Sequence, residues 1–404
     1  MKRQKTIALL LLLLMITPCL RAQKKELSQA RSYIKSGKDF DKAEKLMTDL
    51  LEKDSANKTN KKIYLTWFQA VTEQYKAANE KLYLKQQYDT AAFFNLTRRL
   101  YAIAETLDTL DAQPDGKGRV KLRYREDHAR QLNLLRPNLY FGGTYHLRKE
   151  NYQTAFDFFE TYIDAAEKPL FKGYDYNKTD KRLPEVAYWA SYAGYKMQDA
   201  PKTLKYFDMA VKDTSKASYA MQYACEAYRW QQNEQAYLAM LKRGFAAYPD
   251  FPYFFPRLVD YYNAREHPDS ALYYADAALK SNPNSELFLL AKSVALLNLE
   301  RYDECIQVSE RLIAQNDSLA EPYFNIATAK LNQVLELDRR NQPRVYRQQI
   351  RKLYMEARPY MEAYRKLAPD EKQKWAPALY RIYFNLNMGK QFDEIDKILK
   401  KQKR

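Results

Sequence analysis

The sequence predicts an all-α protein, built as an α-solenoid of stacked helix–turn–helix units. Small residues recur every 34 residues through the middle of the chain, and only the first interval is longer, by 14 residues. The chain has nine glycines in 404 residues, fewer than a fold with many tight turns and β-bulges would need. A fixed period of this length is typical of stacked helical hairpins, because one hairpin alone cannot bury its apolar face.

Two series of small residues define the period. One series marks the first helix of each unit, and the other marks the second helix, twelve residues later. The first series is Gly143, Ser191, Cys225, Val259, Ser293 and Ala327, and the second is Ala155, Thr203, Tyr237, Ala271 and Cys305, where Tyr237 departs from the pattern. Small side chains let the neighbouring helix approach closely, so we expect these positions to be buried. Both cysteines should then be free core thiols, too far apart to form a disulfide.

The N-terminal segment, residues 1–22, resembles a secretory signal of a Gram-negative bacterium. A basic start is followed by the apolar run Ile7–Ile16, which is too short to span a bilayer. We expect cleavage after Ala22 and a periplasmic mature protein. Lipid attachment at Cys19 is not expected, because Pro18 stands where lipoprotein signals carry a small residue. No later stretch approaches the ~20 apolar residues of a membrane helix, so no membrane span is expected.

The charge balance is strongly basic. Removal of the four cations in residues 1–22 lowers the formal charge from +17 to +13. An exported basic protein meets acidic proteins, acidic glycans or lipid head groups, so no nucleic-acid partner is expected. We favour the simpler interpretation that the dispersed lysines keep a long solenoid soluble.

We expect residues 23–136 to form helical units whose repeat period is degenerate. The only glycine-rich spot is Asp115–Gly118, which we interpret as a loop. A charged helix is expected over residues 120–135. Pro137 then opens the regular array.

The regular array covers residues 137–371 and is followed by a helical pair and basic tail at 372–404. Insertions interrupt the period near 168–184 and 335–352. The second insertion is charged and helical in character, so we expect extended helices there. Insertions in solenoids lie along one edge of the stack and often determine specificity.

The insertion at 168–184 is rich in aromatic residues, namely Phe171, Tyr174 and Tyr176. Exposed aromatic side chains in a loop can anchor a partner. The alternative is that these rings fold back over the gap between units, and the sequence leaves both interpretations open.

The residues of the array resemble the tetratricopeptide repeat (TPR) family. The matching second helices carry Ala271, Ala275, Ala278 and Pro283 in one unit and Ala357, Met361, Tyr364 and Pro369 in another, and the best first helix is Ala320–Ala329. The resemblance is clear over 137–369 and looser over 24–110 and 372–400. It implies a right-handed solenoid with a concave surface lined by the first helices.

The sequence contains few residues and motifs that are typical of catalytic sites. The three histidines, His128, His146 and His267, are not within helical reach of one another, and no phosphate-binding loop, paired CxxC or HExxH motif is present. We therefore expect no enzyme activity, no cofactor and no metal site.

The first helices carry an aromatic and basic set of residues at helical spacing. The predicted groove residues are Tyr140, Arg148, Tyr188, Tyr192, Tyr195, Lys196, Tyr219, Arg229, Trp230, Tyr253 and Asn263. Aromatic and arginine side chains dominate binding hot spots. Our hypothesis is a periplasmic scaffold that binds an envelope protein during cell-envelope assembly or secretion. The alternative is a protein that binds an anionic glycan or peptidoglycan, with tyrosines stacked on sugar rings.

Overall fold

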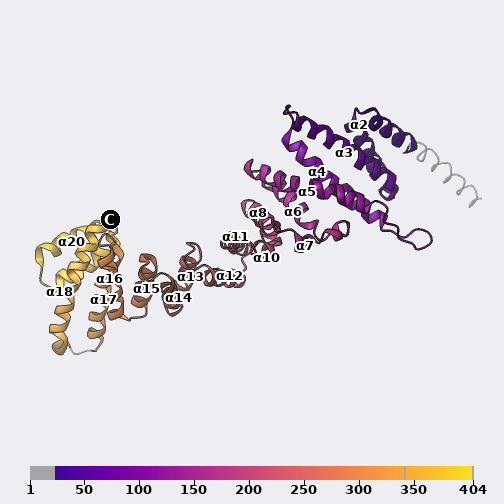
Figure 1. Cartoon of the computed structure of the whole chain (residues 1–404). Helices are drawn as coiled ribbons and strands as arrows, with labels where there is room; N and C mark the ends of the chain where they lie inside the picture. The colour runs from indigo at the N-terminus through magenta and orange to yellow at the C-terminus, as the bar shows by residue number, and fades with distance from the viewer. Residues whose placement is uncertain (1–22, 341–342, 403–404) are drawn as a thin grey trace, which may run out of the picture. The chain divides into compact units, whose positions relative to one another are not determined.

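The computed structural model describes residues 23–340 and 343–402, and every regular element within them is a helix (Figure 1). The all-α fold class is therefore confirmed. The predicted signal segment, with Cys19 and Ala22, lies outside the described residues. Among the residues that are described, no helix is both long and apolar enough to cross a membrane. The chain divides into two compact units, 1–234 and 235–404, a division that falls inside the predicted array.

The first unit is a succession of helical hairpins in which each helix packs on the next. Residues 23–36 form its first described helix. The others are α2 (Phe40–Lys53), η1 (Ser55–Thr59), α3 (Lys61–Tyr83), α4 (Thr90–Asp111), α5 (Arg125–Arg148), α6 (Tyr152–Asp164), η2 (Pro169–Tyr174), α7 (Tyr176–Thr179), α8 (Leu183–Lys196), α9 (Ala200–Lys205), α10 (Phe207–Ala210) and α11 (Ala217–Trp230).

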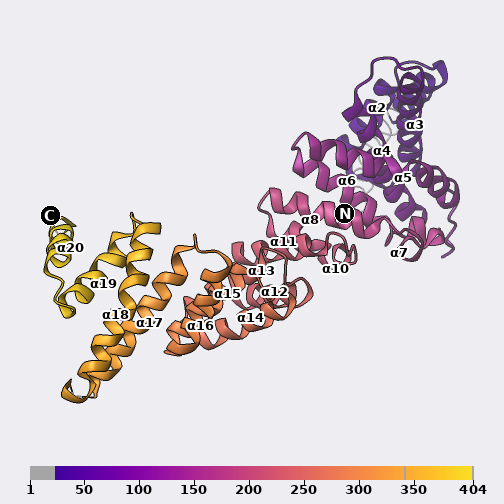
Figure 2. The ribbon, with the colours of Figure 1, turned by 60° about the vertical axis from the view of Figure 1, so that its left-hand side comes forward.

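The second unit continues the same hairpin pattern to the C-terminus. Its helices are α12 (Glu234–Ala247), α13 (Phe254–Asn263), α14 (Pro268–Ser281), α15 (Glu286–Asn298), α16 (Tyr302–Gln315), α17 (Ala320–Arg339), α18 (Pro343–Leu367), α19 (Lys372–Asn385) and α20 (Gly389–Gln402). The insertion at 335–352 forms extended helices as expected, since it lengthens α17 and α18, which lie side by side and reach past α16 and α19 (Figure 2).

The 34-residue period is visible in the backbone. The turns inside five hairpins each place one residue in the left-handed region, seven positions after a residue of the first small series. These residues are Glu150, Gln198, Gln232, Glu266 and Glu300, with φ of 58°, 55°, 55°, 57° and 59°. A left-handed residue at this point ends a helix and reverses the chain. The predicted helix–turn–helix unit is therefore confirmed.

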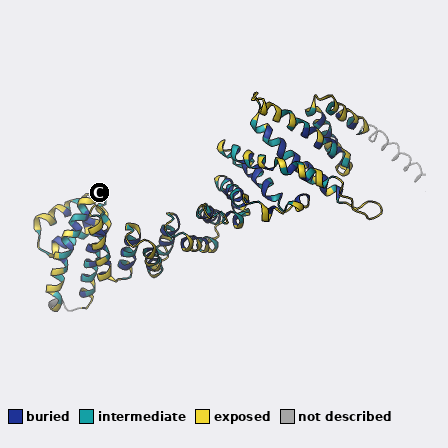
Figure 3. Ribbon diagram, in the orientation of Figure 1, coloured by how far each residue is buried: buried dark blue, intermediate teal, exposed yellow. Residues whose placement is uncertain are grey.

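The small residues of the period are buried, as predicted. All six of the first series are buried, and so is every member of the second series except Tyr237, which is half-buried. The buried residues form a stripe along the packed side of each helix (Figure 3). At Gly143 the fit is so close that a Cβ atom would lie 2.3 Å from the Phe159 ring. Cys225 and Cys305 are buried with 0% exposure and are not joined in a disulfide.

The helix expected over residues 120–135 begins later and ends later than predicted. Helix α5 begins at Arg125 and runs through Pro137 to Arg148, and residues 120–124 are not helical. Leu132 and Leu139, both with 0% exposure, lie on the two sides of the proline and seven residues apart. Positions i and i+7 share a helix face, so tertiary packing of this face holds the helix together across the proline.

The insertion at 168–184 folds back into the core, so one of the two open alternatives is right. Phe171 and Tyr176 are buried, and the Tyr176 hydroxyl donates a hydrogen bond to Asn133 Oδ1 at 2.7 Å. The buried Arg136 of α5 lies between two rings, with its guanidinium carbon 3.7 Å from the Tyr162 ring centroid and 3.8 Å from that of Tyr176. The insertion is thus fixed to α5 and α6.

Candidate functional site

The predicted groove residues fall in both units. Nine of them lie on α5, α8 and α11 of the first unit, whereas Tyr253 and Asn263 belong to the second. Tyr253 is buried beneath Arg257, whose guanidinium carbon is 3.7 Å from its ring centroid, and Asn263 is half-buried. Both residues lie within the second unit, so the candidate site is the face formed by α5, α8 and α11.

The core of this face is a cluster of aromatic rings from α8 and α11, which we call the α8–α11 aromatic cluster. Its members are Tyr188, Trp189, Tyr192, Tyr195, Tyr223 and Trp230. Tyr223 is the centre of the cluster, because its ring centroid lies within 5.9 Å of those of Tyr188, Tyr192 and Tyr195. Ring pairs at these distances add stability beyond their area burial.

The ring of Tyr195 is held between two others. It stacks on Tyr223 with 4.5 Å between centroids and on Trp230 with 5.8 Å, and the interplanar angles are 21° and 23°. Tyr223 and Trp230 are seven residues apart on one helix, a rise of about 10.5 Å. Tyr195 therefore contacts two rings of α11 that lie about two helical turns apart.

The inner end of the cluster is a buried pair of phenols. The hydroxyls of Tyr188 and Tyr223 lie 3.2 Å apart. Burial raises the pKa of both tyrosines above the ordinary value, so both phenols are neutral at physiological pH. The prediction that Tyr188 belongs to the groove surface is wrong, because this side chain is 7% exposed and packs against α11.

The outer side of the face is basic and partly exposed. Arg148, Lys196, Tyr219 and Arg229 are exposed, and Tyr140, Tyr192, Tyr195 and Trp230 are half-buried. The Lys196 ammonium lies 5.4 Å from the Tyr152 ring centroid, and Arg229 pairs with Glu226 at 2.9 Å. The Tyr140 hydroxyl donates to Glu185 Oε1 at 2.9 Å.

Two cluster residues, Trp189 and Tyr223, were missed by the sequence analysis. They are 34 residues apart and therefore occupy the same position in consecutive units. An aromatic residue repeated at one position of the period was the signal that would have identified them.

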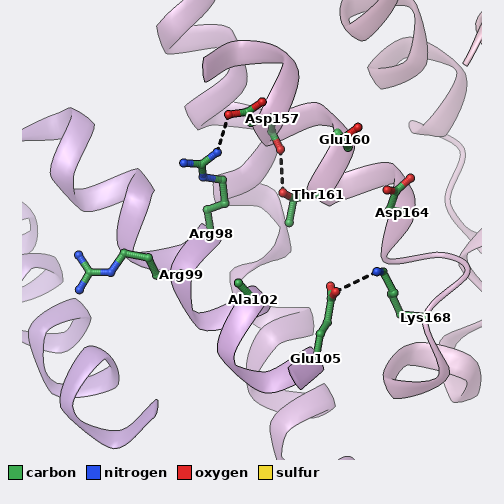
Figure 4. Close-up of a pocket in the computed structure, with 9 residues that line it drawn as sticks. All are labelled: Arg98, Arg99, Ala102, Glu105, Asp157, Glu160, Thr161, Asp164 and Lys168. Carbon is green, nitrogen blue, oxygen red and sulfur yellow. Dashed lines mark hydrogen bonds and ion pairs between the residues drawn. The ribbon is translucent and has the colours of Figure 1, made fainter. Parts of the chain in front are cut away.

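A separate pocket of about 360 Å³ lies between α4 and α6 (Figure 4). Its carboxylates are already bound within the molecule: Arg98 pairs with Asp157 at 2.9 Å, and Lys168 pairs with Glu105 at 3.1 Å. Burial raises the pKa of Glu105, and the hydrogen bond from Lys168 opposes that rise. This charge pairing indicates a structural network that joins α4, α6 and the insertion.

Two histidines pack against aromatic rings. His146 stacks on Phe158 at 5.5 Å, and His128 lies 4.3 Å from the Phe68 ring centroid. Burial lowers the pKa of both imidazoles, so both are neutral at pH 7. Across residues 23–340 and 343–402, no group of three or more His, Cys, Asp or Glu side chains is placed to hold a metal ion.

Comparison with known proteins gives structural similarity only. No protein-family model matches the chain, and no curated protein sequence matches it. Matching solved structures include the C-terminal part of a TPR repeat-containing protein from Cytophaga hutchinsonii, with 12% identity over 64% of this chain and 93% of that one, at a TM-score of 0.42. Yeast Tom70 matches with 15% identity over 91% of this chain and 89% of that one, at a TM-score of 0.34. The TPR2AB domain of yeast Sti1, in complex with an Hsp90 peptide, matches with 10% identity over 63% of this chain and 98% of that one, at a TM-score of 0.25.

Proposed function

We propose that the chain is a TPR-type scaffold of the periplasm that binds an envelope protein through the face formed by α5, α8 and α11. The observation that carries the proposal is the α8–α11 aromatic cluster with exposed cations beside it. Binding hot spots combine rigid aromatic side chains with arginine, and a face that is already ordered loses little entropy on binding.

The ring geometry favours a protein partner over the glycan alternative. Stacking on a sugar requires a free ring face, and Tyr195 already stacks on two rings of the protein, Tyr223 and Trp230. The half-buried tyrosines of this face also carry hydroxyl groups that can form hydrogen bonds. These groups suit the carbonyls and side chains of a polypeptide, and Lys196 and Arg229 suit an acidic segment.

The test of the face is an affinity pull-down from envelope extract with a triple variant, Lys196→Ala, Tyr219→Ala and Arg229→Ala. These three side chains are exposed, so the aromatic cluster stays intact. Hot-spot losses of at least about 2 kcal/mol predict roughly thirtyfold weaker retention of the partner.

The matched control replaces an arginine, a tyrosine and a lysine that are exposed on other helices. These are Arg31, Tyr83 and Lys62. A partner retained by the native protein and the control but lost by the triple variant supports the proposal. Equal retention by all three proteins would show that the face is not the binding site.

The periplasmic location has its own test. Mass spectrometry of the protein from a periplasmic fraction should show a mature chain that begins at Gln23, without lipid. A full-length chain in the cytoplasmic fraction would refute the location and leave the binding face untouched.

A further inference from the structure

The loop between α4 and α5 builds a second pocket in the first unit, away from the aromatic cluster. Figure 1 shows this loop extending from the ends of the two helices. The pocket has a volume of about 540 Å³ and is lined by the end of α4, the loop, the start of α5 and the start of α3. This volume is in the range of small-molecule sites.

The pocket has an excess of positive charge. Four cations line it, Lys61, Arg119, Lys121 and Arg123, against two carboxylates, Asp111 and Asp115. The N-terminus of α3 also lies here and adds its partial positive charge.

The two carboxylates are committed to internal partners. Asp111 is 3% exposed, and it accepts hydrogen bonds from Lys61 Nζ at 3.0 Å and from the Arg123 backbone N–H at 2.5 Å. Asp115 accepts from the backbone N–H groups of Arg119 and Lys117 and pairs with the Arg119 guanidinium at 3.1 Å. Both carboxylates therefore stabilise the loop and neutralise only part of the positive charge.

Two of the four cationic side chains are available to bind a ligand. The side chains of Lys121 and Arg123 are exposed, and neither forms an ion pair within the part of the chain that the structure describes. The guanidinium fork of arginine matches a phosphate, and a lysine ammonium adds a point charge. The net excess of two positive charges balances the charge of about −2 that a phosphate monoester carries at neutral pH.

The pocket also has an apolar part, beside the polar residues Thr59 and Gln113. Leu110, Pro114 and Tyr124 line it beside the cations. Inorganic phosphate would leave this apolar part in water, whereas a monoester would cover it with its organic group. We propose that the α4–α5 pocket binds a phosphate monoester, with the phosphate at Lys121 and Arg123 and the organic group against Leu110 and Tyr124.

The test is titration calorimetry of the full mature chain at pH 7.5 and low salt, with phenyl phosphate, inorganic phosphate and phthalate. Phenyl phosphate should bind more tightly than the other two, because inorganic phosphate lacks the ring and phthalate lacks the phosphate. Vesicles with and without phosphatidic acid then distinguish a lipid head group from a free monoester as the natural source.

The decisive variant is Lys121→Gln with Arg123→Gln, matched by a control of the same types, Arg31→Gln with Lys149→Gln. Loss of two charge-assisted contacts predicts phenyl phosphate binding at least about tenfold weaker in the first variant, with no change in the control. An equal loss in the control, binding of phthalate as tight as phenyl phosphate, or no binding at all would overturn the proposal.

Discussion

The buried Arg136 should contribute more to the stability of the first unit than any exposed charge. Its guanidinium lies between the rings of Tyr162 and Tyr176, donates to the Tyr162 carbonyl at 3.1 Å and pairs with Asp180. Replacing it by methionine keeps most of the volume and leaves Asp180 half-buried without its cation. Breaking a buried ion pair costs about 3–5 kcal/mol. A desolvated cation–π contact is worth up to about 2 kcal/mol, and we count it within this range because the same substitution removes both interactions.

We therefore expect Arg136→Met to lower the free energy of unfolding of the first unit by about 3–5 kcal/mol. For a unit of this size, that loss lowers the Tm by about 6–20 °C. Arg136→Lys keeps the charge but loses the planar fork, so its effect should be intermediate. Scanning calorimetry of the full chain measures the Tm, and hydrogen exchange of residues 169–179 shows whether the insertion opens.

The matched control is Arg130→Met on the same helix. Arg130 pairs with Asp127 at 3.0 Å, but its side chain is 70% exposed, and such pairs contribute about 0–1 kcal/mol. The reasoning is refuted if Arg136→Met behaves like this control, or if exchange of the insertion is unchanged.

Three further predictions concern packing and titration. In urea unfolding, Gly194→Ala should lower the free energy of unfolding by about 1–3 kcal/mol, because the new Cβ would lie 2.5 Å from the Thr203 backbone nitrogen. The control Gly173→Ala should have almost no effect, because no atom lies within 4 Å of its Cβ position. Burial raises the pKa of the Cys305 thiol, so iodoacetamide should label it only after unfolding; labelling of the native protein would contradict its packing. Burial lowers the pKa of His146 in the folded protein, so the unfolded chain binds a proton at this imidazole more readily. The contribution of His146 to stability is therefore fully present above pH 6.5 and is lost as the pH falls below 6.5. His146→Gln should therefore flatten the loss of Tm between pH 7.5 and 5.5, and an unchanged slope would show that another group is responsible.

The 34-residue period predicted which small residues are buried. It could not predict burial that depends on contacts between residues far apart in the sequence. The buried small residues follow from the spacing, because each unit presents the same helix face to the next. Tyr188 and Tyr192 share a face of α8, yet only Tyr188 is buried, since its depth depends on Tyr223 of the next unit.

The insertion and the proline show the same limit. Whether residues 168–184 fold back depends on Arg136, which lies more than thirty positions earlier in the chain. The helix expected to end at residue 135 continues through Pro137, because Leu132 and Leu139 are buried on one of its faces.

The five left-handed turn residues have a consequence for how this array can be engineered. Each is a glutamate or glutamine where glycine is the usual choice, and left-handed backbone costs such residues about 1–2 kcal/mol. Glycine would relieve that strain but lose about 0.5–1 kcal/mol of backbone entropy, so each exchange has a small net effect. Because the turns are a full unit apart, their effects should add. Exchanges at these turns therefore adjust stability in small steps, one hairpin at a time, and leave the buried stripe and the face formed by α5, α8 and α11 unaltered.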